Sequence, residues 1–187
     1  MYGLVNLAVQ QLVTEKFGAA VWAEIKRKVA LQTETFNRMQ AYPDSLTFNM
    51  VGAVCEVTGL SAEQVLFAFG EYWVLYTGNQ GYGHLFEMAG SSLRDFLHNL
   101  DNLHSRVGQN FTHLRPPSFV AEDLDAQTVR LHYHTERSGL CSMVFGLING
   151  LARRFGVEAT VTHPECRAKG GEQCIFDIKI TNPEALS

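Results

Sequence analysis

Hydrophobic positions recur at helical spacing through the first two thirds of the chain. A period of about 3.6 residues predicts helices over residues 4–13, 22–30, 62–76 and 92–107. The last of these has the most regular apolar stripe, and His104 lies on it. Ser61 and Gln64 have the spacing of a capping box, which predicts that the third helix begins at Ala62.

The pattern changes after the break Arg115-Pro116-Pro117, which cannot continue a helix. Apolar and polar residues then alternate over residues 128–137, as in a β-strand. A further helix is predicted over 141–155, with strands over 157–162 and 174–180. These elements predict an α+β fold: a helical N-terminal lobe, and a C-terminal lobe with an antiparallel sheet and a helix, ordered strand–strand–helix–strand–strand.

Composition narrows the class of protein. The 187 residues are 46% hydrophobic and carry a net charge of −4, which is typical of a folded domain without the basic stripe of a nucleic-acid module. No apolar run reaches the roughly 20 residues of a membrane helix, and the first residues lack the features of a signal peptide. We therefore expect a cytoplasmic protein with neither nucleic-acid nor membrane partners. The absence of a nucleophile triad, phosphate loop or paired catalytic carboxylates predicts that it is not an enzyme.

His104 is the first residue with distinctive chemistry. It follows Leu97 and Leu100 on the apolar stripe, so its imidazole is expected to face the core. A buried imidazole needs a partner, and two interpretations fit. It is either a core histidine bonded to a carbonyl group, or the axial ligand of a haem iron.

Tyr133, Thr135 and Arg137 form the second distinctive set. Their spacing of two residues places all three on one face of the predicted strand, and that face begins with the apolar Val129 and Leu131. An inward arginine is unfavourable unless it meets an anion. It could pair with an internal carboxylate of the chain, or the three donors could bind the carboxylates of a ligand. Haem would satisfy both sets, with His104 on the iron and these donors on the propionates.

These residues belong to segments that resemble the haem–nitric oxide/oxygen binding (H-NOX) family, which includes the haem domain of soluble guanylate cyclase. The segments are Met1–Asn6, Ala68–Trp73, Leu100–Val107, Arg115–Pro117 and Tyr133–Arg137. The resemblance spans nearly the whole chain and implies a single haem domain over residues 1–187. The family motif is Tyr-x-Ser-x-Arg, and this chain has Thr135 at the serine position, which keeps the hydroxyl and adds a methyl group.

The resemblance also implies where the haem lies. It would sit between a distal helical lobe of about residues 1–60 and a proximal, sheet-bearing lobe of about residues 61–187. Pro117 matches a proline that presses on the haem, and Val5 matches an apolar residue on the distal side. Simple packing would explain both residues equally well without a haem.

The side chains expected on the distal side of the haem predict which gas binds. In the oxygen-binding branch of the family, a tyrosine on the helix after the Tyr-x-Ser-x-Arg strand donates a hydrogen bond to O2. Alignment puts Met143 there, or Ser142 if the register differs by one residue, and methionine has no such donor. Bound O2 needs that bond far more than NO does. We therefore expect the ferrous protein to bind NO and CO and exclude O2, although the Trp73 indole is another donor that could line the distal side.

Three cysteines and one histidine form a further candidate site. His163, Cys166 and Cys174 flank a predicted hairpin, and Cys141 begins the helix before it. This donor set matches a structural zinc site, which some H-NOX proteins carry. Free buried thiols, or thiols that form a disulfide when zinc is lost, are the alternatives. Cys55 lies in an apolar helical segment and is expected to belong to the core.

The sequence therefore predicts a haem-based nitric oxide sensor in which NO weakens the bond between iron and His104. The chain contains no output module, so the resemblance implies a separate partner, either a histidine kinase or a cyclic-di-GMP enzyme. The alternative function is a thiol and zinc redox sensor that controls the same kind of partner.

Overall fold

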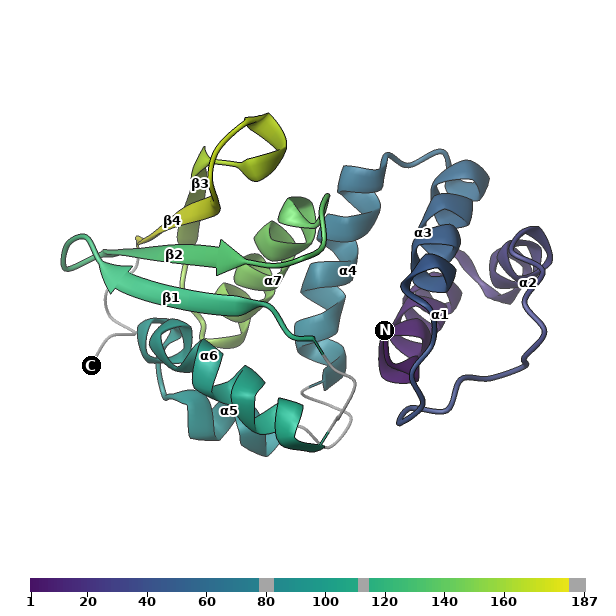
Figure 1. Cartoon of the computed structure of the whole chain (residues 1–187), viewed down its shortest axis with the longest axis horizontal. Helices are drawn as coiled ribbons and strands as arrows, with labels where there is room; N and C mark the ends of the chain where they lie inside the picture. The colour runs from purple at the N-terminus through teal and green to yellow at the C-terminus, as the bar shows by residue number, and fades with distance from the viewer. Residues whose placement is uncertain (78–82, 111–114, 182–187) are drawn as a thin grey trace.

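The computed structural model describes residues 1–77, 83–110 and 115–181 and has a helical lobe beside a sheet-bearing lobe (Figure 1). Its first part contains α1 (Gly3–Phe17), α2 (Ala19–Lys28), α3 (Asp44–Thr58), α4 (Ala62–Thr77), α5 (Gly83–Ala89) and α6 (Leu93–Asn110). Its second part contains β1 (Ser118–Asp123), β2 (Thr128–His134), α7 (Cys141–Arg154), β3 (Ala159–Glu165), the short 3-10 helix η2 (Arg167–Lys169) and β4 (Cys174–Ile180). This is an α+β fold, as predicted.

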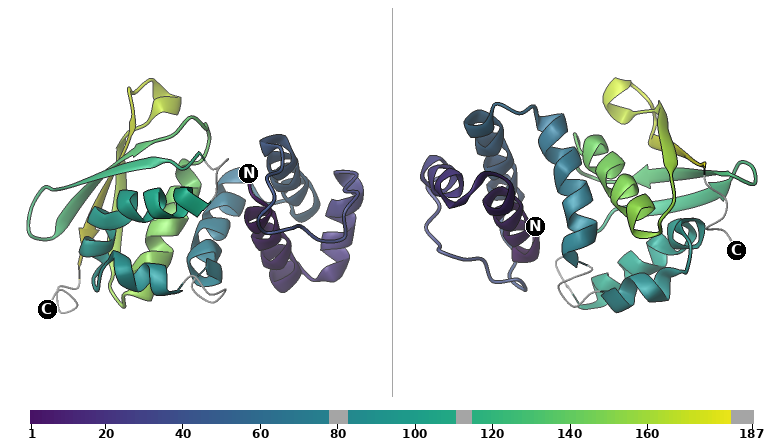
Figure 2. Two further views of the ribbon diagram at one scale, coloured as in Figure 1. Left: turned by 60° about the horizontal axis from the view of Figure 1, so that its bottom comes forward. Right: turned by 180° about the vertical axis from the view of Figure 1, so that it is seen from behind.

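Helices α1 to α4 enclose the core of the helical lobe (Figure 2). Their buried side chains form one hydrophobic cluster, which contains Leu12, Ile25, Met50, Val54 and Phe69. A buried hydrogen bond joins α1 to α3 inside this core, because the Thr47 hydroxyl donates to the side-chain oxygen of Asn6 at 2.6 Å. The lobe is therefore held by apolar packing with one satisfied polar contact at its centre.

The strands of the described chain form a four-stranded antiparallel sheet in the order β1-β2-β4-β3. Helices α6 and α7 cover one face of it: α6 contacts β1 and β2, and α7 contacts β3. Between this face and the helices lies a second hydrophobic cluster, which contains Leu97, Leu131, Ile148, Phe176 and Ile178. In β2 the alternation of side chains sends every second residue, from Val129 to Tyr133, into this core.

Helix α4 links the two lobes. Its residue Phe69 packs in the helical-lobe cluster, whereas Val74, five residues later, packs in the sheet-lobe cluster. Helix α7 lies alongside α4 (Figure 1), and glycines allow the close approach. A Cβ atom at Gly146 would overlap the backbone oxygen of Phe67. The joint between the lobes therefore depends on the absence of a side chain at this position.

Most predicted elements are confirmed. The stripe predicted over residues 92–107 forms α6, and the helix predicted to begin at Ala62 forms α4. The capping box before α4 is present: the Ser61 N–H donates to Gln64 Oε1 at 2.9 Å, and the Gln64 N–H donates to the Ser61 hydroxyl at 3.2 Å. Local signals of this kind located the helix correctly.

The prediction was wrong for the end of the strand over residues 128–137. Strand β2 ends at His134, and the Arg137 N–H turns back to donate to the Thr135 hydroxyl at 3.1 Å. Tyr133 therefore lies on the buried face of β2, as predicted, but Thr135 and Arg137 lie in the loop that follows. The three donors come from a strand end and a loop, and not from one strand face.

No single helix within residues 1–77, 83–110 and 115–181 is long and apolar enough to cross a membrane. The helices over residues 44–58 and 62–76 reach the required length and hydropathy only as a pair, which is bent by 114°. Residues Met50, Val54 and Phe69 of this pair are buried in the helical-lobe core.

Substituting Gly146→Ala should destabilise the protein, because the added Cβ atom would push α4 away from α7. We expect the free energy of unfolding to fall by roughly 1–3 kcal/mol, as for other overpacked contacts. Gly52→Ala is the matched control, because Gly52 lies in α3 with open space around its Cβ position. There, better helix propensity should raise the free energy of unfolding by about 0.5–1 kcal/mol. Urea denaturation measures both values, and equal effects would contradict the close contact of α4 and α7.

Candidate haem and metal sites

His104 lies on α6 and faces the sheet. Its Nδ1 atom is 2.8 Å from the backbone oxygen of Leu100, one turn earlier, so Nδ1 carries the proton and donates it. The lone pair then lies on Nε2, the nitrogen that a neutral imidazole can offer to a metal. Burial lowers the pKa of His104, which favours the neutral form. The hydrogen bond to a backbone carbonyl, which a core histidine would make, is thus present. The same hydrogen bond also prepares a histidine to bind iron through Nε2.

Helix α6 is attached to the sheet at two places. Near His104, the Phe119 N–H of β1 donates to the Asp101 carboxylate at 3.0 Å. Near the start of the helix, Arg94 donates to the Ala126 backbone oxygen at 2.7 Å. His98 is exposed on the same helix, and its Nε2 is 3.0 Å from Asp123, which helps to hold the pKa of that carboxyl group below its usual value. The helix that carries His104 is therefore coupled to β1 and to the β1–β2 hairpin.

Arg137 pairs with a carboxylate of the other lobe. Its Nε donates to Asp44 at the start of α3 at 2.8 Å, and its Nη1 donates to the Arg115 backbone oxygen at 3.0 Å. Burial alone would raise the pKa of Asp44, but hydrogen bonds from the Met1 amino group and from Arg137 hold it below its usual value. The internal ion pair that was one interpretation of this arginine is thus observed. A guanidinium has five N–H donors, so this pairing leaves it able to bind a further anion.

Charged groups gather where the two lobes meet. A cavity of about 450 Å³ lies there, and Tyr42, Asp44, Arg115, Glu136 and Arg137 are among the residues that line it. Burial raises the pKa of the nearby Tyr133 phenol, which therefore stays protonated and able to donate at neutral pH. The donor types at this junction suit the carboxylates of a haem.

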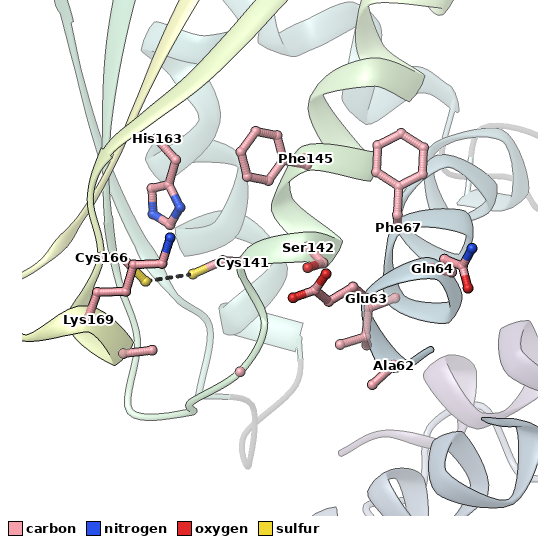
Figure 3. Close-up of a pocket in the computed structure, with 13 residues that line it drawn as sticks. Ala62, Glu63, Gln64, Phe67, Cys141, Ser142, Phe145, His163, Cys166 and Lys169 are labelled. Carbon is pink, nitrogen blue, oxygen red and sulfur yellow. Dashed lines mark hydrogen bonds between the residues drawn. The ribbon is translucent and has the colours of Figure 1, made fainter. Parts of the chain in front are cut away.

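The predicted distal residues gather in the helical lobe. Val5, Trp73 and Met143 all pack against the helical-lobe cluster, and the Trp73 ring lies 5.9 Å from the Phe69 ring between centroids. Ser142, the alternative to Met143 in the alignment, lines a groove at the start of α7 instead (Figure 3). The predicted proximal residues His104 and Tyr133 lie in the sheet-bearing lobe instead.

The four residues of the predicted zinc site are brought together. Figure 3 shows three of them, Cys141, His163 and Cys166. One ligand atom from each of Cys141, His163, Cys166 and Cys174 lies within 4.8 Å of all the others. The Cys141 sulfur is 3.9 Å from that of Cys166 and 3.6 Å from that of Cys174. Two sulfurs bound to one tetrahedral zinc ion at about 2.3 Å lie about 3.8 Å apart. The observed separations agree with that value.

His163 also fits a metal-binding role. Its Nε2 atom is buried and has no hydrogen-bond partner among the described residues. Burial lowers the pKa of His163, so the imidazole is neutral, whereas burial and the neighbouring thiols raise the pKa of Cys141 to about 12. A divalent cation would satisfy the nitrogen and favour the thiolates. Cys55 lies elsewhere, packed against the helical-lobe cluster as predicted.

A groove of about 770 Å³ borders this cluster (Figure 3). Its walls come from the start of α4, the start of α7 and the connection between β3 and β4. They include Phe67, Phe145 and Lys169. Cys141, His163 and Cys166 also line it, so three of the four cluster residues border the groove.

The residues that sequence reasoning missed make contacts between distant segments. Asp44 is 93 residues from its partner Arg137, and no spacing pattern joins the two. Phe119 and Phe176 pack beside His104 and His163, respectively, but each has the ordinary appearance of an apolar strand residue. Only the register of the sheet brings these rings to the two sites.

Comparison with known proteins identifies the family. A family model described as "Haem-NO-binding" matches residues 2–163, which is most of the chain. The protein therefore belongs to the haem–NO-binding family, whose members are known as H-NOX domains.

Curated relatives are soluble guanylate cyclases. The chain is 31% identical over 155 residues to gcy-33 of Caenorhabditis elegans, which covers 83% of this chain and 16% of that protein. It is 31% identical over 157 residues to gcy-35 of the same organism, covering 82% and 23% respectively. It is 27% identical over 155 residues to cyclase 89Da of Drosophila melanogaster, covering 83% and 23%. The chain thus spans less than a quarter of the length of these relatives.

Solved H-NOX structures share the fold. A mutant of the S. oneidensis H-NOX protein in the Fe(II) state has a TM-score of 0.90 at 21% identity, covering 97% of both chains. The Fe(II)NO state of the protein from that organism has a TM-score of 0.88 at 21% identity, covering 97% of this chain and 100% of that one. An Fe(II) unliganded mutant from K. algicida has a TM-score of 0.84 at 20% identity and covers 100% of both chains. At these identities, the likeness establishes the fold.

Proposed function

We propose that this H-NOX domain is a nitric oxide sensor and not an enzyme. The observation that carries the proposal is the neutral His104 imidazole, whose Nδ1 is held by the Leu100 carbonyl so that Nε2 can bind iron. Ferrous haem supplies an iron that binds diatomic gases. Tyr133, Thr135 and Arg137 would bind the propionates, with Arg137 as the charged donor.

The same proposal assigns a side of the haem to each lobe. Residues of about 1–60 form the distal lobe and residues of about 61–187 the proximal lobe of a single domain. Val5 of the distal lobe lines the distal side, together with Trp73 of α4 and Met143 of α7, which belong to the other lobe but pack against the same helical-lobe cluster. Pro117, half-buried just before β1, presses on the haem from the sheet-bearing lobe.

Gas selectivity follows from the side chain at position 143. Bound O2 carries partial negative charge and gains about 1–3 kcal/mol from a buried hydrogen-bond donor, which NO and CO need far less. Met143 packs in the helical-lobe cluster and offers no donor. The domain therefore binds NO and CO and excludes O2.

The signal arises when the bond between iron and His104 weakens. Because His104, Asp101 and Arg94 share helix α6, release of the imidazole frees this helix to move against β1. NO drives the change by binding the released state more tightly. The partner is a separate histidine kinase or cyclic-di-GMP enzyme in the cytoplasm, where the reducing environment keeps the thiols free.

An absorption spectrum of the purified ferrous protein tests cofactor and selectivity together. We expect a haem spectrum that changes when NO or CO is added under nitrogen and shows no oxy complex in air. Addition of NO after exposure to air and re-reduction controls for loss of the haem. A stable oxy complex would contradict the assigned role of Met143, and a chain that stays colourless with added hemin would refute the haem proposal.

His104→Gly with free imidazole tests the signalling step. Imidazole should restore the iron ligand without connecting it to α6, so haem binding should recover while NO no longer switches the partner. His98→Gly is the matched control, because His98 lies on the same helix but is exposed and pairs with Asp123. Normal switching by the His104→Gly variant would show that the signal takes another route.

A second candidate function rests on the cysteine cluster. Cys141, Cys166 and Cys174 approach one another as in a tetrahedral zinc site. Cys141 and Cys166 border an open groove, so oxidants could reach them. Loss of zinc on thiol oxidation would then control the same kind of partner. Under the first proposal, zinc is structural.

Metal analysis and Cys174→Ala separate the two candidate functions. Protein purified without added zinc should contain about one zinc ion per chain, because the four ligands of a closed site bind it tightly. Cys174→Ala should lose the zinc but still respond to NO if the haem is the sensor, whereas a thiol sensor would lose its response. Cys55→Ala is the control and should keep both properties, because Cys55 lies outside the cluster. A zinc content near zero in the unmodified protein would remove the site.

A further inference from the structure

Five rings form a continuous row across the covered face of the sheet. The row begins with His104 on α6, whose ring centroid lies 5.2 Å from that of Phe119 on β1. Tyr133 on β2, Phe176 on β4 and His163 on β3 follow, with centroid separations of 5.2, 6.3 and 4.3 Å. The row takes one ring from each strand in the order in which the strands lie in the sheet. We call these five residues the aromatic row.

The central rings of the aromatic row are buried and closely packed. Phe119 is 7% exposed, Tyr133 is 5% exposed and Phe176 is fully buried. The His163 and Phe176 rings are stacked with an interplanar angle of 5°. Three of the four separations lie within the range of about 4.5–7 Å at which aromatic pairs attract one another, and the stacked His163–Phe176 pair is closer still, at 4.3 Å. Because the core is close-packed, a shift of one ring displaces its neighbours.

The two ends of the row are the two proposed metal ligands. His104 would bind the haem iron, and His163 belongs to the Cys3His cluster with Cys141, Cys166 and Cys174. The backbone of the sheet also connects the two sites, since Tyr133 pairs in register with Phe119 on one side and with Cys174 on the other. Asp101 holds the Phe119 backbone to α6, so movement of that helix reaches the row through the main chain too.

We propose that the aromatic row couples the two sites, so that release of His104 from iron weakens zinc binding at the Cys3His cluster. This inference rests on the proposed function, because it needs both haem and zinc in place. Zinc fixes the His163 ring in its stacked position and thereby steadies the row against which His104 packs. Coupling between two sites is reciprocal, so zinc in turn favours the state in which His104 stays on the iron.

The test measures the zinc dissociation constant of the haem-loaded ferrous protein by competition with a chromophoric chelator, under nitrogen. We expect NO, added in stoichiometric amount, to raise this constant at least about fivefold, the lower end of typical coupling between sites. CO should leave it unchanged, because CO does not displace the axial histidine. By reciprocity, removal of zinc should increase the affinity for NO by the same factor.

Phe176→Leu tests whether the aromatic row carries the effect. It removes the ring next to His163 and keeps an apolar side chain, so zinc and haem should still bind while NO no longer changes the zinc constant. Phe96→Leu is the matched control: Phe96 is a buried ring of the same cluster that packs against Phe86 and Phe155 outside the row. Direct attack of NO on the thiols would persist in Phe176→Leu, so it is distinguished from coupling.

The outcomes separate this inference from the proposed function. A protein that takes up both haem and zinc but whose zinc constant is the same with and without NO overturns the coupling and leaves the sensor intact. A response that survives in Phe176→Leu also overturns the role of the row. Failure to load haem refutes the proposed function and the coupling with it, whereas failure to load zinc overturns the coupling and leaves the haem sensor intact. Because the comparison with and without NO uses the unmodified chain, the test does not depend on the folding of any variant.

Discussion

The hydrogen bond from His104 to the Leu100 carbonyl is the constraint on which the proposed sensor depends. It joins a side chain to the backbone of its own helix at 2.8 Å, so α6 itself fixes the orientation and tautomer of the imidazole. Displacement of the imidazole therefore becomes displacement of α6. The Asp101 bond to the Phe119 N–H passes that displacement to β1. A histidine held by a loop would absorb the same force locally, without moving a secondary-structure element.

The Asp44–Arg137 ion pair gives the junction of the lobes its electrostatic character. It connects the start of α3 to the loop after β2, so one guanidinium serves both lobes. A haem propionate at the same guanidinium would share its donors and reduce the stabilisation of the Asp44 carboxylate. Haem binding and the contact between the lobes would consequently be linked through Arg137. An arginine in the loop after β2 could thus belong to a ligand site and to a contact between the lobes at once.

The sequence was sufficient wherever the determining interactions are local. The Ser61–Gln64 capping box lies within four residues, and the stripe that ends at His104 lies on one helix, so both were predictable. The grouping of the Cys3His residues was also predictable, because three of them flank a predicted hairpin and Cys141 begins the helix before it. The end of β2 was not, since the alternating pattern continues in the sequence through Arg137. Only the tertiary contact with Asp44, 93 residues away, shows where that arginine goes.

The Cys3His cluster lies at the opposite edge of the sheet from α6 and also affects how far the lobes can move. Cys141 begins α7, whereas Cys166 and Cys174 flank the connection between β3 and β4, so a bound metal would cross-link that connection to the helix. Without a cation the Cys141 thiol resists ionisation, since burial and the neighbouring thiols raise its pKa to about 12, and the position of this ligand then depends on packing. Helix α7 meets α4 at Gly146, the joint between the lobes. Metal binding would therefore stiffen the element against which the distal lobe must move.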